Sequence, residues 1–175
     1  MKDFMSKLLN DLRVELSDEF DKNFERKAFF NRKWKPRKHG RKGTLMMVTG
    51  KLRRSLRSSV NGRSITWTSS EPYAAIHNEG GSITVTAKMK RFFWATYYEA
   101  GGKIKYNKSG AMSKSSQNAS AEAEFYKSLA LMRVGSKINI PERRFIGEAE
   151  QVTACVEKAV KEGLNNVLKE FTKKN

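Results

Sequence analysis

The chain has 175 residues, of which 38% are hydrophobic and 30% charged, and its formal net charge is +17. This length predicts a single domain, residues 1–175, with a hydrophobic core of its own. No apolar run approaches the length of a membrane span, and acidic residues interrupt the apolar ones of residues 1–16, unlike in a secretory signal. Membrane-spanning and secreted classes are thereby excluded, and we expect a soluble chain that stays in the cytoplasm of the cell that makes it.

The surplus positive charge is concentrated in about a quarter of the chain. Residues 26–70 contain fourteen Lys or Arg and no Asp or Glu, whereas the other 130 residues contain twenty-one basic and eighteen acidic side chains. Such a local excess is expected of a surface that meets a polyanion or an acidic partner. The alternative is a solvated face whose charge only keeps the protein soluble.

Apolar residues recur every four positions from Phe4 to Phe24 and predict a first helix over residues 2–29. Acidic residues crowd its first two-thirds, while Arg26 and Lys27 lie near its C-terminal end, where cations suit the helix dipole. The acidic part of this helix on one copy could face the basic segment of the next copy and favour a ring. An exposed helix with ordinary charges is the alternative.

Two basic segments follow the first helix. Residues 31–43 contain seven basic side chains, a proline and two glycines, and they predict a mobile basic loop pinned by Trp34. Residues 51–57 predict a short helix capped by Thr49, with its two leucines on one face and its three arginines on the other.

A hairpin and a short helical turn come next. Asn61 and Gly62 predict a tight turn between two strands, because both of its central positions need positive φ. Pro72 suits the first position of a helical turn that Gly80 and Gly81 end. The side chains that this turn would place on one side are those of Tyr73, Ile76 and His77.

Residues 83–87 alternate as in an edge or half-buried strand. Five aromatic residues then lie within residues 92–98, and their spacing gathers four of them on one helical side. We interpret these four as core packing or an interface. A stacking platform for single-stranded nucleic acid is the less favoured alternative.

The C-terminal part of the chain ends in a long helix. Residues 111–125 are small and polar and predict a mobile run, after which a helix resumes over residues 121–132. Residues 137–140 predict a strand that Pro141 stops. Residues 147–173 are amphipathic throughout, so the apolar stripe of this last helix should cover the sheet.

Residue types suited to catalysis or metal binding are scarce. His77 and Glu79 resemble the His-x-Glu of zinc deaminases, but those enzymes need a downstream Pro-Cys-x-x-Cys element, and Cys155 is the only cysteine. That cysteine lies in an apolar helical pattern, so we interpret it as a buried small residue. His39, the only other histidine, lies in the basic loop, where a metal cation would be repelled.

We therefore expect no enzymatic activity, no cofactor and no metal. A nuclease would need acids or histidines that hold a metal near the scissile phosphate, and residues 26–70 contain no acid. The expected role of His77 is structural, with its ring hydrogen-bonded to a backbone group near the double glycine.

Four segments in a fixed order carry a family resemblance. They are FFNRKWKP at residues 29–36, TGxLRxS at 49–55, YAxIHNxGG at 73–81 and IPxRxFIG at 140–147. Together they resemble the virion morphogenesis, or tail completion, family of tailed bacteriophages, whose members include Mu-type and P2-type proteins. The signature positions expected to be structural are Trp34, Pro36, Thr49, Gly50, Leu52, Ser55, Tyr73, Ala74, His77, Gly80, Gly81, Pro141, Arg143, Phe145 and Gly147.

The resemblance implies an α+β fold in which a small antiparallel sheet is flanked by long N-terminal and C-terminal helices, with residues 100–136 as an insertion. It also implies a structural virion protein of the phage neck, assembled in the cytoplasm of the bacterial host, which completes the tail and joins it to the head. The implied partners are further copies of the chain in a ring, a hexamer by analogy with tail symmetry, neighbouring head–tail connector and tail proteins, and packaged double-stranded DNA in the channel.

The alternative is a stand-alone nucleic-acid-binding protein that uses residues 26–70. In either function the basic residues of this segment would face DNA or an acidic partner. They are Arg32, Lys33, Lys35, Arg37, Lys38, Arg41, Lys42, Lys51, Arg53, Arg54 and Arg57.

Overall fold

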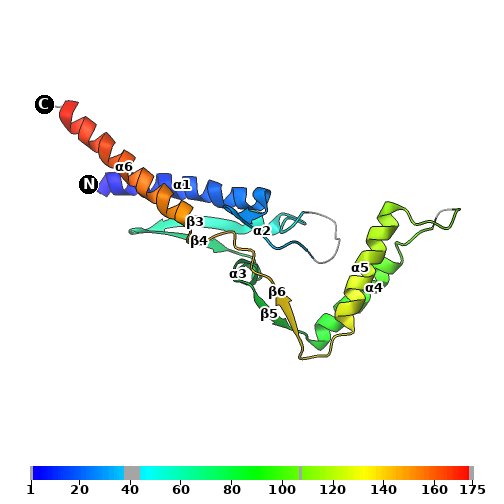
Figure 1. The fold of residues 1–175 in the computed structure, drawn as a ribbon. Coiled ribbons are helices and arrows are strands. Elements are labelled where there is room, and N and C mark those ends of the chain that lie inside the picture. The colour runs from blue at the N-terminus through cyan, green and yellow to red at the C-terminus, as the bar shows by residue number, and fades with distance from the viewer. Residues whose placement is uncertain (1, 38–43, 107, 174–175) are drawn as a thin grey trace.

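A computed structural model describes residues 2–37, 44–106 and 108–173 and shows two parts, an elongated body and a projecting arm (Figure 1). The elements of the body are α1 (Lys2–Arg26), β1 (Ala28–Phe29), β2 (Arg32–Lys33), α2 (Lys51–Ser55), β3 (Leu56–Asn61), β4 (Ser64–Ser69), α3 (Ala74–Glu79) and α6 (Glu150–Lys173). The elements of the arm are β5 (Gly81–Thr84), α4 (Ala87–Gly101), α5 (Lys114–Ala130) and β6 (Lys137–Ile140). The predicted α+β class, with long terminal helices and small antiparallel pairing, is confirmed.

The strands form three separate two-stranded antiparallel sheets, β1–β2, β3–β4 and β5–β6. In the β3–β4 hairpin, Leu56 lies opposite Ser69 and Asn61 lies opposite Ser64. The turn therefore holds Gly62 and Arg63, one residue later than predicted. Gly62 has a φ of 60°, the positive value that a type II′ turn needs at its first central position.

The apolar stripe of α1 is buried in the core of the body. Leu12, Leu16, Phe20 and Phe24 are all buried, as the four-residue spacing predicted. The helix ends at Arg26, earlier than predicted, because Lys27 has a φ of 54° and turns the chain into β1. The strands β1 and β2 replace the last part of the predicted helix and the start of the predicted basic loop.

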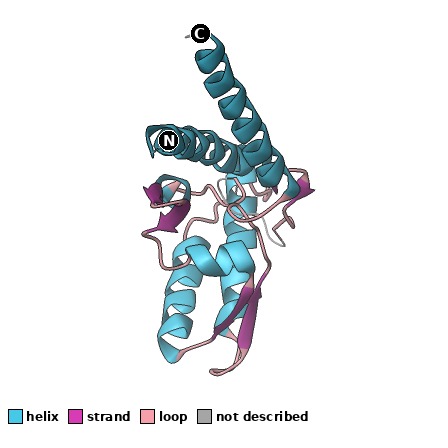
Figure 2. Cartoon of the chain, turned by 90° about the vertical axis from the view of Figure 1, so that its left-hand side faces the viewer, coloured by secondary structure: helices cyan, strands magenta, loops and turns pink. Residues whose placement is uncertain are grey.

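The last helix, α6, packs mainly on α1. The cluster that it joins reaches the strands only through Phe29 of β1 and Trp67 of β4, so α6 does not lie across a sheet as predicted. Val152 and Val156 join the cluster formed by Leu16 and Phe20. Farther along, Gly163 allows a close helix contact, because a Cβ at this position would lie 3.0 Å from the ring of Phe4. Beyond this contact α6 leaves α1 at an angle, as Figure 2 shows.

The arm is a helical hairpin on a β-ribbon. α4 begins at Ala87 because the Thr86 hydroxyl accepts the Met89 amide at 3.2 Å, so the strand predicted over residues 83–87 ends at Thr84. α5 begins at Lys114, since the Ser113 hydroxyl accepts the Ser116 amide at 3.2 Å.

The polar run predicted to be mobile is therefore helical. Its small buried residues, Ser116 and Ala123, let α5 lie against α4. The strand predicted over residues 137–140 is confirmed as β6. None of the helices in the part of the chain that the structure describes combines the length and apolarity that a membrane crossing requires.

Candidate functional site

The signature motifs meet in one small core at the C-terminal end of α1. Its buried members are Phe24, Trp34, Leu52, Ala74 and Phe145, none of them more than 8% exposed. The ring of Phe24 lies 5.8 Å from that of Trp34 and 5.1 Å from that of Phe145, measured between centroids. The four segments that carry the resemblance are thus folded into a single packing unit, which we call the signature core.

Two asparagine side chains fix the backbone that leads into α6. The Asn78 Oδ1 atom accepts the backbone N–H groups of Phe145 at 2.9 Å and Ile146 at 3.1 Å. Asn23, which is fully buried, donates from Nδ2 to the Phe145 carbonyl oxygen at 3.2 Å and accepts the Phe30 amide at 2.9 Å. Buried backbone groups without partners are costly, so these side chains stabilise this one conformation.

Sequence reasoning missed Asn23 altogether. A signal was nevertheless present, because a polar residue stands next to Phe24 and three positions after Phe20, on the side of α1 whose apolar residues predict burial.

Two further hydrogen bonds join the segment after β2 to the segment before α6. The Trp34 indole N–H donates to the Arg144 carbonyl oxygen at 2.6 Å, and the Arg143 Nε donates to the Lys35 carbonyl oxygen at 3.1 Å. Arg143 is 9% exposed, and burial, followed by the charge of Arg37, lowers the pKa of its guanidinium. Among the signature positions of this region, Pro36 is exposed.

His77 contributes its backbone to the signature core. Its carbonyl oxygen accepts the Arg143 amide at 2.8 Å, and its ring meets the Tyr73 ring edge-on at 5.9 Å. The ring atom Nδ1 is buried without a hydrogen-bond partner among the described residues, so the predicted bond from the ring to the backbone is wrong. Burial, followed by the positive charge of Arg143, lowers the pKa of His77, which leaves the ring neutral at neutral pH.

The end of α3 lies against the residues that follow β6. Gly80 has a φ of 77°, and a Cβ at this position would lie 2.8 Å from the backbone nitrogen of Glu142. Only glycine permits both the φ and the approach. The next residue, Gly81, pairs with Ile140 just before Pro141. The beginning of α3 differs from the prediction, because Pro72 lies outside the helix and Tyr73 is its N-cap.

The TGxLRxS motif positions α2. Its N-cap is Gly50, with a φ of 69°. The hydroxyl of Thr49, one residue earlier, accepts the amide of Lys51 at 3.4 Å, so Thr49 serves an amide of the first turn as predicted, although it is not itself the N-cap. At the other end, the Ser55 hydroxyl donates to the Leu52 carbonyl oxygen at 2.7 Å and lies 2.7 Å from the Ser69 hydroxyl. Ser55 therefore ties α2 to β4. The last signature glycine, Gly147, lies between the signature core and α6.

Arg53 differs from the other basic residues because its charge is compensated within the chain. Its guanidinium donates to both carboxylate oxygens of Asp21, at 2.6 Å from Nε, and to Glu25 at 2.8 Å. The hydrogen bonds that Arg53 donates to Asp21 and then to Glu25 raise the pKa of its guanidinium. Arg53 consequently adds little to the surplus charge of the surface.

Six of the other basic residues predicted to face DNA or a partner are exposed and form no ion pair with any described residue. They are Arg32, Lys33, Lys35, Lys51, Arg54 and Arg57. Arg37 donates to the Thr44 carbonyl oxygen. The predicted positions Lys38, Arg41 and Lys42 lie outside the described residues, as does most of the predicted basic loop.

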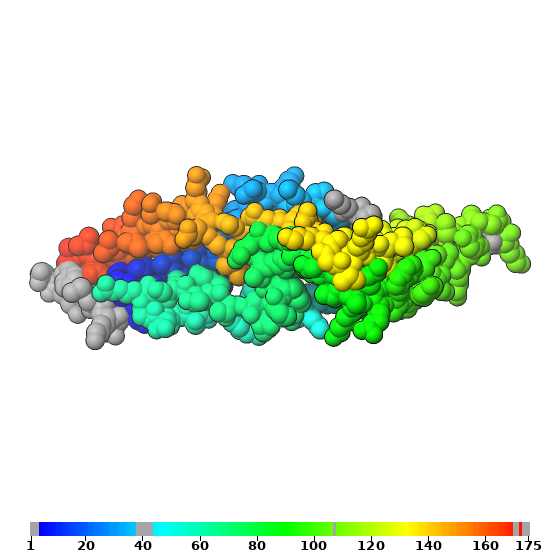
Figure 3. Space-filling view, turned by 90° about the horizontal axis from the view of Figure 1, so that it is seen from below, coloured from blue at the N-terminus to red at the C-terminus, as the bar shows by residue number. Residues whose placement is uncertain are grey.

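The exposed cations flank the body on two sides. Figure 3 shows the β1–β2 hairpin, in light blue, on one edge of the body and the β3–β4 hairpin, in teal, on the opposite edge. Arg32 and Lys33 lie on β2 and Arg57 lies on β3, so the strands that carry these exposed cations lie on opposite edges of the body.

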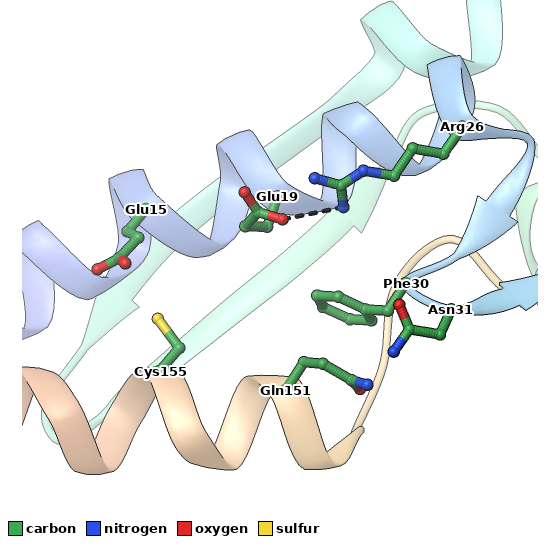
Figure 4. A pocket seen from close by; sticks show the side chains of 7 residues that line it. All are labelled: Glu15, Glu19, Arg26, Phe30, Asn31, Gln151 and Cys155. Carbon is green, nitrogen blue, oxygen red and sulfur yellow. Dashed lines mark hydrogen bonds and ion pairs between the residues drawn. The ribbon is translucent and has the colours of Figure 1, made fainter.

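A groove of about 390 Å³ lies between α1 and α6 (Figure 4). Its lining includes Glu15, Gln151 and Cys155, and an ion pair of 3.0 Å joins Glu19 to Arg26. Burial, followed by the charge of Glu15, raises the pKa of the Cys155 thiol to about 11, so the thiol is protonated and unreactive at neutral pH. Residues 2–37, 44–106 and 108–173 bring together no group of three His, Cys, Asp or Glu that could hold a metal ion.

The comparison with known families agrees with the signature core. The model of the phage virion morphogenesis family matches residues 5–168, nearly the whole chain, and this range contains every signature motif and the arm. No curated protein and no solved structure matches the chain significantly. The chain therefore belongs to the phage virion morphogenesis family, which implies a structural role in the virus particle.

Proposed function

We propose that the protein is a structural component of the phage neck, where copies form a ring around the DNA channel, complete the tail and join it to the head. The observation that supports this most directly is the set of exposed cations without ion pairs on a member of a virion morphogenesis family. A part that lines a channel for a polyanion, or seats on an acidic ring, needs such charge. It needs no reacting groups.

The arrangement of the cations suits a subunit with two contacts. Lys51, Arg54 and Arg57 follow one another on α2 and β3, whereas Arg32 and Lys33 lie on the other edge of the body. A ring subunit has one surface toward the lumen and another toward the ring above or below it. We assign one basic surface to the packaged DNA and the other to an acidic neighbouring protein.

The joining role is tested by complementation. A phage that lacks this chain should accumulate DNA-filled heads beside separate finished tails, and purified protein added to that lysate should restore joined, infectious particles. Electron microscopy with a label on the chain should place it at the neck of these particles. Normal joining in its absence, or a label found only elsewhere, would refute the proposal.

The second candidate, a stand-alone nucleic-acid-binding protein, is favoured by the same exposed cations. The double variant Arg54→Gln/Arg57→Gln separates the two functions. Arg53→Gln is the matched control for one charge, because it removes a cation that Asp21 and Glu25 already compensate.

A stand-alone binder should lose affinity for short duplex DNA in the double variant, and the slope of log affinity against log salt should fall by about 1.8 for two lost phosphate contacts. A joining protein should instead lose particle assembly while it stays folded by circular dichroism. Wild-type joining activity in the double variant would contradict a role for this surface in the neck.

A further inference from the structure

The β3–β4 ribbon has two faces with different surroundings. Its residues alternate between part-buried and exposed along both strands. The part-buried face packs on α1, where the Trp67 ring meets the Phe20 ring edge-on at 5.2 Å and the indole N–H donates to the Ser17 hydroxyl at 2.9 Å. A two-stranded ribbon is marginally stable on its own, so α1 provides the support that holds its conformation.

The outer face of the ribbon, directed away from α1, carries only polar side chains. Six exposed residues form it, and they lie opposite one another as Arg57 and Thr68, Ser59 and Thr66, and Asn61 and Ser64. The exposed Arg63 follows in the turn, and residues 56–70 contain no Asp or Glu. In the view of Figure 3 no other element covers the ribbon, drawn in teal. The outer face is therefore a cationic, polar surface.

The hydroxyl groups of the two faces also differ in their hydrogen bonds. On the part-buried face, the Ser58 hydroxyl accepts that of Ser17 at 3.1 Å, and the Ser69 hydroxyl lies 2.7 Å from that of Ser55. The outer face has four hydroxyl groups, and none of them is hydrogen-bonded to any residue that the structure describes. They belong to Ser59, Ser64, Thr66 and Thr68. Their donors and acceptors are available to a ligand.

The cations of the ribbon lie at its two ends. Arg57 is near the start of β3 and Arg63 is in the turn, so at about 3.3 Å per residue they are roughly 15–20 Å apart. Arg57 donates from Nη1 to the Arg54 and Leu56 carbonyl oxygens, at 2.8 and 2.9 Å, which leaves its Nε and Nη2 for a ligand. Neither Arg57 nor Arg63 forms an ion pair with any described residue.

The acidic residues of α1 make their contacts elsewhere. Asp21 and Glu25 bind Arg53, and Lys22 binds the carboxylates of residues 18 and 19. Glu15 lines the groove against α6. Within the described residues, therefore, no ion pair compensates the charge of the outer face.

The composition of the outer face fits nucleic acid better than protein. The centre of a protein–protein interface is enriched in aromatic residues and Met and is depleted in Ser, whereas the outer face has no apolar side chain. Contacts to DNA phosphates come from Arg together with Ser, Thr and Asn, which are the residue types of this face. A stretch of 15–20 Å of duplex carries roughly ten phosphates, so Arg57 and Arg63 can each bind one of them.

We propose that the outer face of the β3–β4 ribbon binds the phosphate backbone of the packaged duplex DNA. This inference rests on the neck position proposed above and identifies which basic surface faces the DNA. The arginines supply charge, and the hydroxyl groups and Asn61 supply hydrogen bonds to phosphate oxygens. Such contacts read no base sequence, so DNA of any sequence can pass along them.

Photo-crosslinking inside assembled particles tests this contact. A diazirine-bearing amino acid replaces Thr66 on the outer face, and the purified chain is added to the lysate of the complementation test. After joined particles have formed they are irradiated, and the chain should become covalently attached to DNA. The same amino acid in place of Thr153, an exposed threonine of α6, is the matched control and should give no DNA adduct.

A negative charge at the same position provides a second measurement. Thr66→Glu should leave the chain in the joined particles, but their infectivity should fall roughly tenfold or more, because every copy then repels the DNA phosphates. Thr153→Glu adds the same charge away from the ribbon and should keep the infectivity of the wild type. Both purified variants should have the circular dichroism spectrum of the wild type.

Several results would overturn the ribbon contact and leave the neck proposal standing. They are joined particles that contain the chain but give no DNA adduct from position 66, an adduct from this position to another virion protein, and wild-type infectivity with Thr66→Glu. Loss of the folded Thr66→Glu chain from the particles would do the same, since the outer face would then be a protein contact. If the wild-type chain itself is absent from joined particles, the neck proposal fails and the ribbon contact fails with it.

Discussion

The hydrogen bonds of Asn78 make the sharpest prediction for the signature core. Asn78→Ala removes the single acceptor that serves the amides of Phe145 and Ile146, at 2.9 and 3.1 Å. Phe145 is 1% exposed, so water does not readily replace the lost partner. A fully buried amide left without an acceptor costs about 1–3 kcal/mol, or about 2–6 kcal/mol for two. Both bonds are only part-buried, so we expect the variant to lose about 2–4 kcal/mol of unfolding free energy.

Urea denaturation followed by far-ultraviolet circular dichroism measures this loss, and at about 2–4 °C per kcal/mol the melting temperature should fall by about 5–15 °C. Asn78→Asp is the matched control, because it keeps an acceptor oxygen at the same position, and it should stay within about 1 kcal/mol of the wild type. If Asn78→Ala unfolds within about 0.5 kcal/mol of the wild type, the two amides are satisfied by something else and the reasoning fails.

Three further predictions concern single residues. Gly80→Ala should destabilise the chain more than Gly62→Ala. Both positions have positive φ, but only at Gly80 would a Cβ meet backbone, at 2.8 Å from the Glu142 nitrogen. Equal shifts of the melting temperature in parallel thermal melts would contradict the close approach. Folding lowers the pKa of His77, so as the pH falls the unfolded chain binds a proton before the folded chain does. The free energy of unfolding should therefore be independent of His77 above about pH 6.5 and should decrease below it. Urea titrations at pH 5 and 7.5 should show a smaller difference for His77→Gln, and an unchanged difference would exclude His77 as the cause. Folding raises the pKa of the Cys155 thiol from 9.0 to about 11. Its thiolate fraction at pH 8 therefore falls roughly 100-fold, and iodoacetamide should modify it roughly 100-fold more slowly in the native chain than in urea. Equal rates would show an accessible thiol.

Local patterns in the sequence predicted most of the secondary structure. The spacing of Phe20 and Phe24 predicted the buried stripe of α1, and the glycine after Asn61 predicted the β3–β4 hairpin within one residue. The errors lie at element ends, where a hydroxyl decides the boundary. Ser113 begins α5 inside a run predicted to be mobile, and Thr86 begins α4 inside a predicted strand. The insertion over residues 100–136 stays a prediction.

The site depends on contacts between residues far apart in the chain, and only some of these follow from the motifs. The motifs marked Trp34 and Phe145 as signature positions, but the sequence alone did not show that they share one core or that Asn23 and Asn78 hold it together.

The sequence by itself determined the class of fold, the family, the local surplus of positive charge and the scarcity of reacting groups. The family, and the class of fold that it implies, follow from the resemblance of four short motifs, whereas the charge surplus and the scarcity of reacting groups follow from composition. Only the tertiary structure decided which cation is compensated: Arg53 faces Asp21 and Glu25, while the adjacent Arg54 does not. It also decided that α6 covers α1 and that the basic residues flank the body on two sides. The reason is that such pairings depend on how elements distant in the chain are packed, and no short window of sequence contains that information.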